Sequence, residues 1–234
     1  MRETYTQRRD ELTTYFDRTA AQAWRALTST EPVNGIRRTV RAGRDEMRRT
    51  LLDWLPDNLE GKTLLDAGCG TGALSLEAAG RGAKVVGIDV AASLVGVARR
   101  RAAGVHTSGS VEFRIGDMVA DAPDQVDYIV AMDSLIHYDA EDVLKIVKSY
   151  TARAREAVLF TSAPWTPMLG AMHFVGRLLP HRAHRAPSIV PLKTQSLMSG
   201  IDGSVSNDGW SASRTARIHS GFYISQAIEV MRAC

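Results

Sequence analysis

The sequence predicts an α/β fold, built on a doubly wound, mostly parallel sheet of seven strands. Three observations support this fold class. Apolar runs of strand length alternate with helix-like segments between residues 62 and 162, a glycine-rich turn follows the first run directly, and two strand-like runs end the chain. Such alternation is typical of helices packed on both faces of a sheet. The last two runs predict a closing hairpin.

The segment before the first strand predicts a helical arm. Residues 1–30 place apolar side chains near helical spacing, proline and glycine interrupt the pattern at 32–35, and a basic stretch with a second apolar face follows. We expect residues 1–55 to form a helical N-terminal arm or cap. Residues 56–234 form the main domain, with a helical cap insertion after the fifth strand, at about 165–208.

The individual elements follow in order. Strands are expected at 63–65, 84–89, 111–115, 126–132, 157–162, 210–218 and 222–231. The fourth run is apolar almost throughout, as in a strand buried on both faces of a parallel sheet. Helices are expected at 73–79, at 91–103 and after Asp139, which is a plausible N-cap.

Composition places the chain among ordinary globular proteins. Its 234 residues are 44% hydrophobic and 24% charged. No run approaches the roughly 20 apolar residues of a membrane span, and the first residues lack a signal-peptide core, so a cytoplasmic protein is expected. The net charge of +3 is uneven: the central residues 56–160 are acidic, and both flanks are basic. Basic flanks favour an anionic partner.

The first candidate binding site is the segment D-A-G-C-G-T-G at residues 66–72. Gly68, Gly70 and Gly72 allow a tight turn and close approach of the backbone to a ligand, and the helix that follows directs free N–H groups to the same place. Because Ala73 also satisfies the dinucleotide fingerprint G-x-G-x-x-G/A, the glycines alone do not exclude a dinucleotide. The acid at position 66, two residues before the first glycine, favours a nucleoside ligand other than a dinucleotide.

Two further acids lie at predicted strand ends. Asp89 ends the second strand, 21 residues after Gly68, and Asp117 follows the third. A carboxylate at the first position can accept hydrogen bonds from both ribose hydroxyls. Together with Asp66, these acids predict a nucleoside-type ligand.

The acid-x-G-x-G-x-G pattern resembles the first motif of the class I methyltransferases, which bind S-adenosylmethionine on a doubly wound sheet. The resemblance implies S-adenosylmethionine as cofactor and S-adenosylhomocysteine as product. It implies cofactor contacts at Asp66, Gly68, Gly70, Gly72, Asp89, Val90, Asp117, Met118 and Asp133.

Other motifs carry a narrower resemblance. Y-F-D at 15–17, D-x-L-I-H-Y at 133–138 and S-A-P-x-T-P at 162–167 resemble the magnesium protoporphyrin IX methyltransferases of chlorophyll and bacteriochlorophyll synthesis. This implies methyl transfer to a propionate carboxylate of magnesium protoporphyrin IX, with magnesium present only as part of that substrate. It also implies a partner in the porphyrin-binding subunit of magnesium chelatase and peripheral contact with the photosynthetic membrane.

The acceptor side of the site follows from the same resemblance. His137 and Tyr15 are the candidates that hold the propionate, and Arg41 and Trp165 the candidates that contact the porphyrin. A carboxylic acid with a pKa of about 4 is already ionised at pH 7. These residues are therefore expected to orient the acceptor rather than to remove a proton from it.

Two alternatives stay open. A quinone-type O-methyltransferase shares the cofactor half, but its phenol acceptor, with a pKa of about 10, needs a general base. A non-catalytic binding partner would retain only the nucleoside pocket. A nucleic-acid substrate is not expected, because the Pro-Pro-aromatic signature for a flipped base is missing after the fourth strand. His181 and His184 are rejected as a metal site because no third ligand lies nearby.

Overall fold

The computed structural model describes residues 3–18, 35–165 and 188–232 of the chain. The helices are α1 (Glu3–Arg18), α3 (Gly35–Asp53), α4 (Ala73–Gly80), α5 (Ala92–Ala103), α6 (Ala140–Thr151) and α8 (Thr194–Val205). The strands are β1 (Thr63–Ala67), β2 (Lys84–Asp89), β3 (Ser110–Ile115), β4 (Val126–Ala131), β5 (Ala154–Ser162), β6 (Trp210–Ser220) and β7 (Tyr223–Arg232). Two 3-10 turns span Leu135–His137 and Ser206–Asp208.

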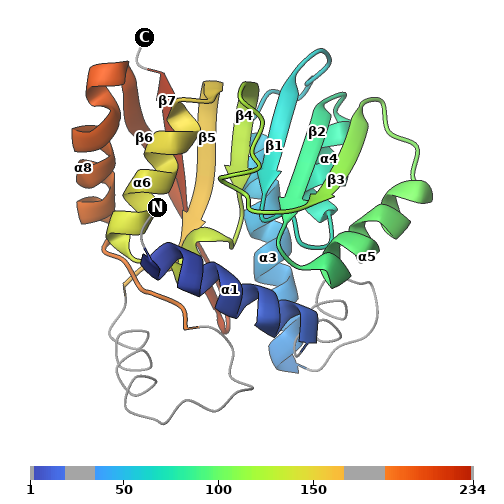
Figure 1. Ribbon diagram of the computed structural model, residues 1–234, viewed down its shortest axis with the longest axis horizontal. Helices are drawn as coiled ribbons and strands as arrows, with labels where there is room; N and C mark the ends of the chain where they lie inside the picture. Colours follow the sequence, from blue (N-terminus) through green and yellow to red (C-terminus); the bar gives the residue numbers. More distant parts are fainter. Residues whose placement is uncertain (1–2, 19–34, 166–187, 233–234) are drawn as a thin grey trace.

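The strands form one sheet of seven in the order β3-β2-β1-β4-β5-β7-β6. Pairs among β1 to β5 are parallel, whereas β7 is antiparallel to both β5 and β6. The order reverses between β1 and β4 (Figure 1). In open α/β sheets, ligands bind beyond the carboxyl ends of the strands at such a point. The predicted fold class and closing hairpin are confirmed.

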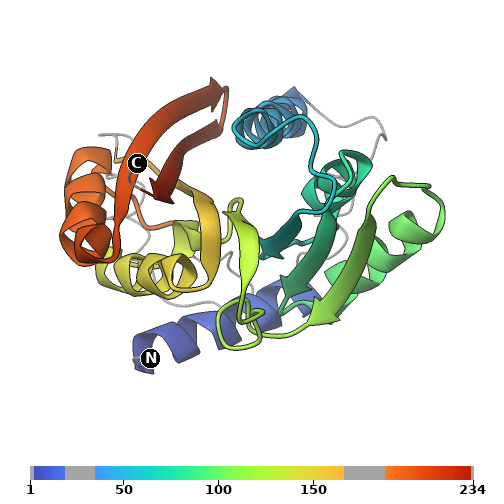
Figure 2. The same ribbon diagram turned by 90° about the horizontal axis from the view of Figure 1, so that it is seen from above.

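Helices cover both faces of the sheet. Figure 2 shows α3, α4 and α5 on one side and α6 and α8 on the other. Successive residues of β4 supply the two cores in turn: Tyr128 and Val130 pack with α3 and α4, and Ile129 and Ala131 pack with α6 and α8. This alternation explains why the strand is apolar throughout.

The helix α8 lies inside the insertion expected at about 165–208. Leu197, Ile201 and Val205 are buried and join the core formed with α6. These three residues recur every four positions, which gives one apolar stripe on a helix. This part of the insertion therefore packs on a face of the sheet, in the same helical layer as α6.

The first two described helices occupy different places. The helix α1 runs across the end of the sheet at which the parallel strands finish (Figures 1 and 2). By contrast, α3 lies against a sheet face, where Met47, Leu51 and Leu52 are buried. The division of the chain at residue 55 into arm and domain stays a prediction.

Candidate active site

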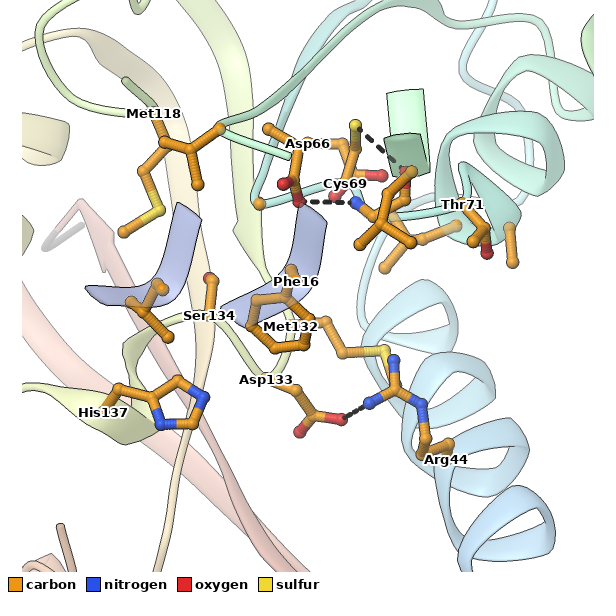
Figure 3. Close-up of a pocket in the computed structure, with 18 of the residues that line it drawn as sticks. Phe16, Arg44, Asp66, Cys69, Thr71, Met118, Met132, Asp133, Ser134 and His137 are labelled. Carbon is orange, nitrogen blue, oxygen red and sulfur yellow. Dashed lines mark hydrogen bonds and ion pairs between the residues drawn. The ribbon is translucent and has the colours of Figure 1, made fainter. Parts of the chain in front are cut away.

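A cavity of about 500 Å³ opens at the carboxyl ends of the strands. This volume lies within the range of small-molecule sites. Its wall is built from the glycine loop after β1, the residues that follow β2 and β4, and one face each of α1 and α3 (Figure 3). The site therefore combines the predicted nucleoside loop with elements distant in sequence.

The glycine loop is shaped for close approach. Gly68 has φ +82°, and a Cβ there would lie 2.5 Å from the Cβ of Ser134. Gly72 has φ +78°, and its Cβ would lie 2.5 Å from the Phe113 ring. Both positions require glycine for conformation and for space. The backbone of the loop can thus meet a ligand directly.

Asp89 joins the loop to the second strand. Its carboxylate accepts hydrogen bonds from the backbone N–H of Gly70 at 2.8 Å and of Ala91 at 2.9 Å, one on each oxygen. A carboxylate offers about four acceptor sites, so two remain. Burial raises the pKa of Asp89, against the effect of the two amides. The residue lines the cavity and fits the two hydroxyls of a ribose.

Asp66 is the most buried acid of the cavity wall, with 2% of its surface exposed. Ser75 donates a hydrogen bond from Oγ to its carboxylate at 2.5 Å. Burial raises the pKa of Asp66 to about 7 despite this bond, and the nearby charge of Asp89 contributes in the same direction. A cationic ligand beside it would favour the ionised form.

This raised pKa makes stability depend on pH. Folded Asp66 holds its proton up to about pH 7, whereas the unfolded residue loses it near 3.8, so the protonated form stabilises the fold below pH 4 and this contribution is lost as pH rises to 7. Asp66→Asn cannot ionise. We expect urea unfolding to show the variant gaining about 3 kcal/mol relative to the native chain between pH 5 and pH 8.5.

The matched control is Asp208→Asn, at an exposed acid outside the cavity. Its free energy of unfolding should follow that of the native chain at both pH values. If the free energy of unfolding changed with pH in the same way in the Asp66 and Asp208 variants, the pKa assigned to Asp66 would be wrong.

His137 lies on the other side of the cavity, in the 3-10 turn after β4 (Figure 3). It is 8% exposed, and its Nδ1 lies 3.3 Å from the carbonyl oxygen of Ser188. Burial lowers the pKa of His137 to about 4, against the effect of this carbonyl. Because a carbonyl can only accept, the neutral ring carries its proton on Nδ1 and leaves Nε2 to meet a ligand.

Asp133 is held by side chains of the protein. Arg44 contacts its carboxylate at 2.6 Å (Figure 3). The Tyr223 hydroxyl donates to the same carboxylate at 3.0 Å, and the backbone N–H of Asp133 donates to Thr161. Asp133 has φ +55°, a left-handed conformation that costs a non-glycine residue about 1–3 kcal/mol. The contacts to α3 and β7 hold the chain in this turn just before Ser134 and His137.

The helix α1 contributes the cover of the cavity. Tyr5, Arg9, Leu12 and Phe16 recur every three or four residues, and all four line the cavity. The Tyr5 hydroxyl donates to Asp117 at 2.8 Å, and Arg9 contacts the other oxygen of Asp117 at 3.1 Å. Burial opposes ionisation of Asp117, but the Ala120 and Val119 amides and these side chains outweigh it and lower its pKa.

The structure brings most of the predicted site residues together. Those that line the cavity are Asp66, Gly68, Gly70, Asp89, Val90, Met118, Asp133, Arg41 and His137. The others are not among the lining residues: Gly72 caps α4, Asp117 binds Tyr5, and Trp165 is 48% exposed. Tyr15 packs edge-on against Phe16, with ring centres 5.2 Å apart, and Phe16 is the residue that faces the cavity.

Sequence reasoning missed several lining residues. Tyr5, Arg9 and Tyr138 were not expected there. The signal for α1 is present: positions 5, 9, 12 and 16 fall on one helical face. Arginines 41, 44 and 48 fall on one face of α3 in the same way, and all three line the cavity.

The described part of the chain holds no cluster of three or more His, Cys, Asp or Glu residues that could bind a metal ion. His181 and His184 lie outside the described residues. Within the same limits, no helix has the length and apolar character needed to cross a membrane.

Comparison with known proteins agrees with this geometry. A model described as "Methyltransferase domain" matches residues 64–156, and one described as "Magnesium-protoporphyrin IX methyltransferase C-terminus" matches residues 131–232. The sheet order and the glycine loop with its strand-end acids define the class as that of S-adenosylmethionine-dependent methyltransferases.

Full-length relatives narrow the class. The chain is 41% identical to magnesium-protoporphyrin O-methyltransferase of Rhodobacter capsulatus over 96% of this chain and 97% of that protein. It is 28% identical to the protein of the same name from Synechocystis, over 94% of each chain. The chain belongs to the magnesium-protoporphyrin O-methyltransferase family, as the motifs predicted.

Solved structures agree. Magnesium protoporphyrin IX methyltransferase from Synechocystis PCC 6803 with bound SAH aligns with a TM-score of 0.83 and 28% identity, covering 97% of this chain and 100% of that one. A ubiquinone biosynthesis O-methyltransferase of Bordetella pertussis is also similar, 28% identical over 80% of this chain and 78% of that protein.

Proposed function

We propose that this protein transfers a methyl group from S-adenosylmethionine to a propionate carboxylate of magnesium protoporphyrin IX, giving the monomethyl ester and S-adenosylhomocysteine. The single observation that carries the proposal is the 41% identity to a magnesium-protoporphyrin O-methyltransferase over nearly the full length of both chains. Magnesium belongs to the porphyrin substrate. The protein acts in chlorophyll or bacteriochlorophyll synthesis.

The cofactor half of the cavity supports the proposal. Asp89 keeps two acceptor sites for ribose hydroxyls, and the glycine loop allows close backbone approach. Asp66, whose ionised form a cation beside it favours, supplies a negative group to a ligand that carries a sulfonium and an ammonium. The residues present therefore fit S-adenosylmethionine.

The chemistry makes modest demands on the protein. A carboxylate oxygen forms the new bond to the methyl carbon, while the bond from that carbon to sulfur breaks and its electron pair stays on sulfur. Because the acceptor is already ionised, no strong base is required. We assign to His137 the role of fixing the carboxylate, while the apolar α1 residues Leu12 and Phe16 exclude water from the site.

Finer parts of the function are also proposals. Residues 1–55 and 165–185 form the cover over the porphyrin, and Arg41 and Trp165 contact it. The partner is the porphyrin-binding subunit of magnesium chelatase. The protein is cytoplasmic, with peripheral contact at the photosynthetic membrane.

One assay tests the main proposal. The protein is incubated with S-adenosylmethionine and magnesium protoporphyrin IX, and the porphyrin is followed by absorbance and by mass spectrometry. We expect one methyl group per porphyrin and S-adenosylhomocysteine in equal amount. Methylation of a catechol in place of the porphyrin would move the assignment to the quinone-type enzymes. Cofactor binding without turnover of either acceptor would indicate a binding protein.

A further inference from the structure

The helix α5 begins without a cap of its own. Its N-cap position is Ala91, which has no side-chain oxygen, and the first turn contains no acid. The first N–H groups of a helix have no partner inside the helix. Asp17, on α1, supplies the missing acceptor: its Oδ1 accepts a hydrogen bond from the Ser93 N–H at 3.0 Å. Ser93 is the second residue of α5, one of the two positions that an N-cap side chain normally binds.

This contact ties α1 to the cofactor side of the cavity. Ala91 directly precedes α5, and its own N–H donates to Asp89. Leu94, in the first turn of α5, lines the cavity. Asp17 thus attaches the last turn of α1 to the segment that leads out of β2.

The same turn of α1 reaches the acceptor side. Phe16 precedes Asp17, lines the cavity and meets the His137 ring edge-on, with ring centres 6.5 Å apart. The positive charge of Arg8, also on α1, opposes protonation of His137, whereas Asp133 favours it. The position of α1 therefore decides how buried His137 is and which charges surround it.

The other half of α1 is attached separately. The Tyr5 hydroxyl donates to Asp117, and the Tyr5 ring stacks on Tyr138 with centres 5.1 Å apart. Loss of the Asp17 contact would therefore release the end of α1 that carries Phe16 while the first turns stay in place.

We propose that Asp17 is a positioning residue: by capping α5 it holds the last turn of α1, so that Phe16 covers His137 on the acceptor side. The catalytic part of this inference rests on the proposed function. The link from Asp17 through Phe16 to His137 depends only on the contacts in the protein.

The first test measures the pKa of His137 by NMR of its imidazole ring. The His137 signal is identified as the one that is missing from the spectrum of the His137→Gln variant, in which Asp17 is intact. The native residue should titrate at about 4. In Asp17→Ala the value should rise by at least one pH unit towards the ordinary 6.5, because Phe16 moves away and water enters. Asp17→Asn keeps an acceptor oxygen and should stay near the native value.

The matched control is Asp10→Ala, which removes an exposed acid from the same helix; Asp10 pairs with Arg9 and does not line the cavity. Its His137 titration should be native. An unchanged His137 titration in Asp17→Ala would overturn the proposal, whatever acceptor the enzyme uses.

A double variant separates positioning from simple helix capping. Ala91→Ser gives α5 an N-cap side chain of its own. When it is combined with Asp17→Ala, the double variant should recover the stability that is lost on removing Asp17, but it still lacks the contact between α5 and α1. We expect stability to recover while kcat/KM for the porphyrin stays at least tenfold below native and S-adenosylhomocysteine affinity changes less than threefold. Full recovery of kcat/KM would show that Asp17 acts only on stability. Lack of porphyrin turnover by the native enzyme would instead refute the proposed function and leave the NMR result standing.

Discussion

Asp89→Ala is expected to lower the affinity for S-adenosylhomocysteine by at least a hundredfold. The native carboxylate has two acceptor sites left after binding the Gly70 and Ala91 amides, and a ribose has two hydroxyls to fill them. Hydrogen bonds to a charged group contribute about 1.5–3 kcal/mol each. Loss of two such bonds corresponds to two or more orders of magnitude in affinity. Calorimetry with S-adenosylhomocysteine measures it directly.

The same variant should also lose stability, which the sequence alone did not predict. Asp89 connects the glycine loop to the turn before α5, and alanine leaves two backbone N–H groups without their acceptor. An unsatisfied buried donor costs about 1–3 kcal/mol. Asp89→Asn keeps one carbonyl oxygen. Its affinity for S-adenosylhomocysteine and its stability should therefore both lie between those of the native protein and those of Asp89→Ala. Unchanged affinity in either variant would remove Asp89 from the cofactor site.

The strands could be predicted because buried parallel strands are apolar throughout. β2 begins and ends where expected, and the fourth run gave β4 to within one residue. β5 starts three residues before its predicted beginning, at Ala154, because Arg155 and Glu156 interrupt the apolar run. Their partners lie across the sheet: Arg155 contacts Asp127, and Glu156 contacts Lys62.

The cofactor half of the site could be predicted for a related reason. Its residues follow directly from the ends of β1 and β2, and neighbouring parallel strands end at the same edge of the sheet. A local sequence pattern was therefore enough to predict where Asp66 and Asp89 lie in the fold.

The rest of the cavity wall depends on contacts between distant segments. Tyr5 reaches Asp117 across 112 positions, and Arg44 reaches Asp133 across 89. Spacing along the chain contains no information about such pairs. The resemblance implied Tyr15 as the acceptor-side residue, yet the rotation of α1 about its own axis places Phe16 in the cavity. That rotation is set by burial of Leu12 and Tyr5.

The surroundings of His137 change what the residue can do. Its ordinary pKa of 6.5 would make it partly charged near neutrality, but burial lowers the pKa to about 4. The Ser188 carbonyl holds the proton of the neutral ring on Nδ1, so Nε2 is an acceptor and cannot donate to a carboxylate. An anionic acceptor beside it favours the charged ring. We therefore expect His137 to gain a proton on Nε2 as the carboxylate binds and to donate a charge-assisted hydrogen bond to it.

His137→Ala is accordingly expected to lower kcat about a hundredfold, the cost of losing alignment between the acceptor oxygen and the methyl carbon. Affinity for S-adenosylhomocysteine should stay within threefold, because His137 lies away from the glycine loop. His137→Gln should retain more activity than alanine, since its amide donates without titrating. The matched control is His219→Gln, at an exposed histidine on β6, which should leave kcat native.

The pH profile of kcat at saturating substrates then separates positioning from base catalysis. In the substrate complex the positioning role requires a protonated His137, so it predicts no loss of kcat as pH falls from 8 to 5.5 and a lower, flat profile for His137→Gln, which cannot titrate. A base must be unprotonated to act, so base catalysis predicts activity lost on protonation near 6.5 and a glutamine variant as inactive as alanine. That second result would favour a phenol acceptor, whose proton must be removed, over the porphyrin carboxylate, which has none to lose at pH 7.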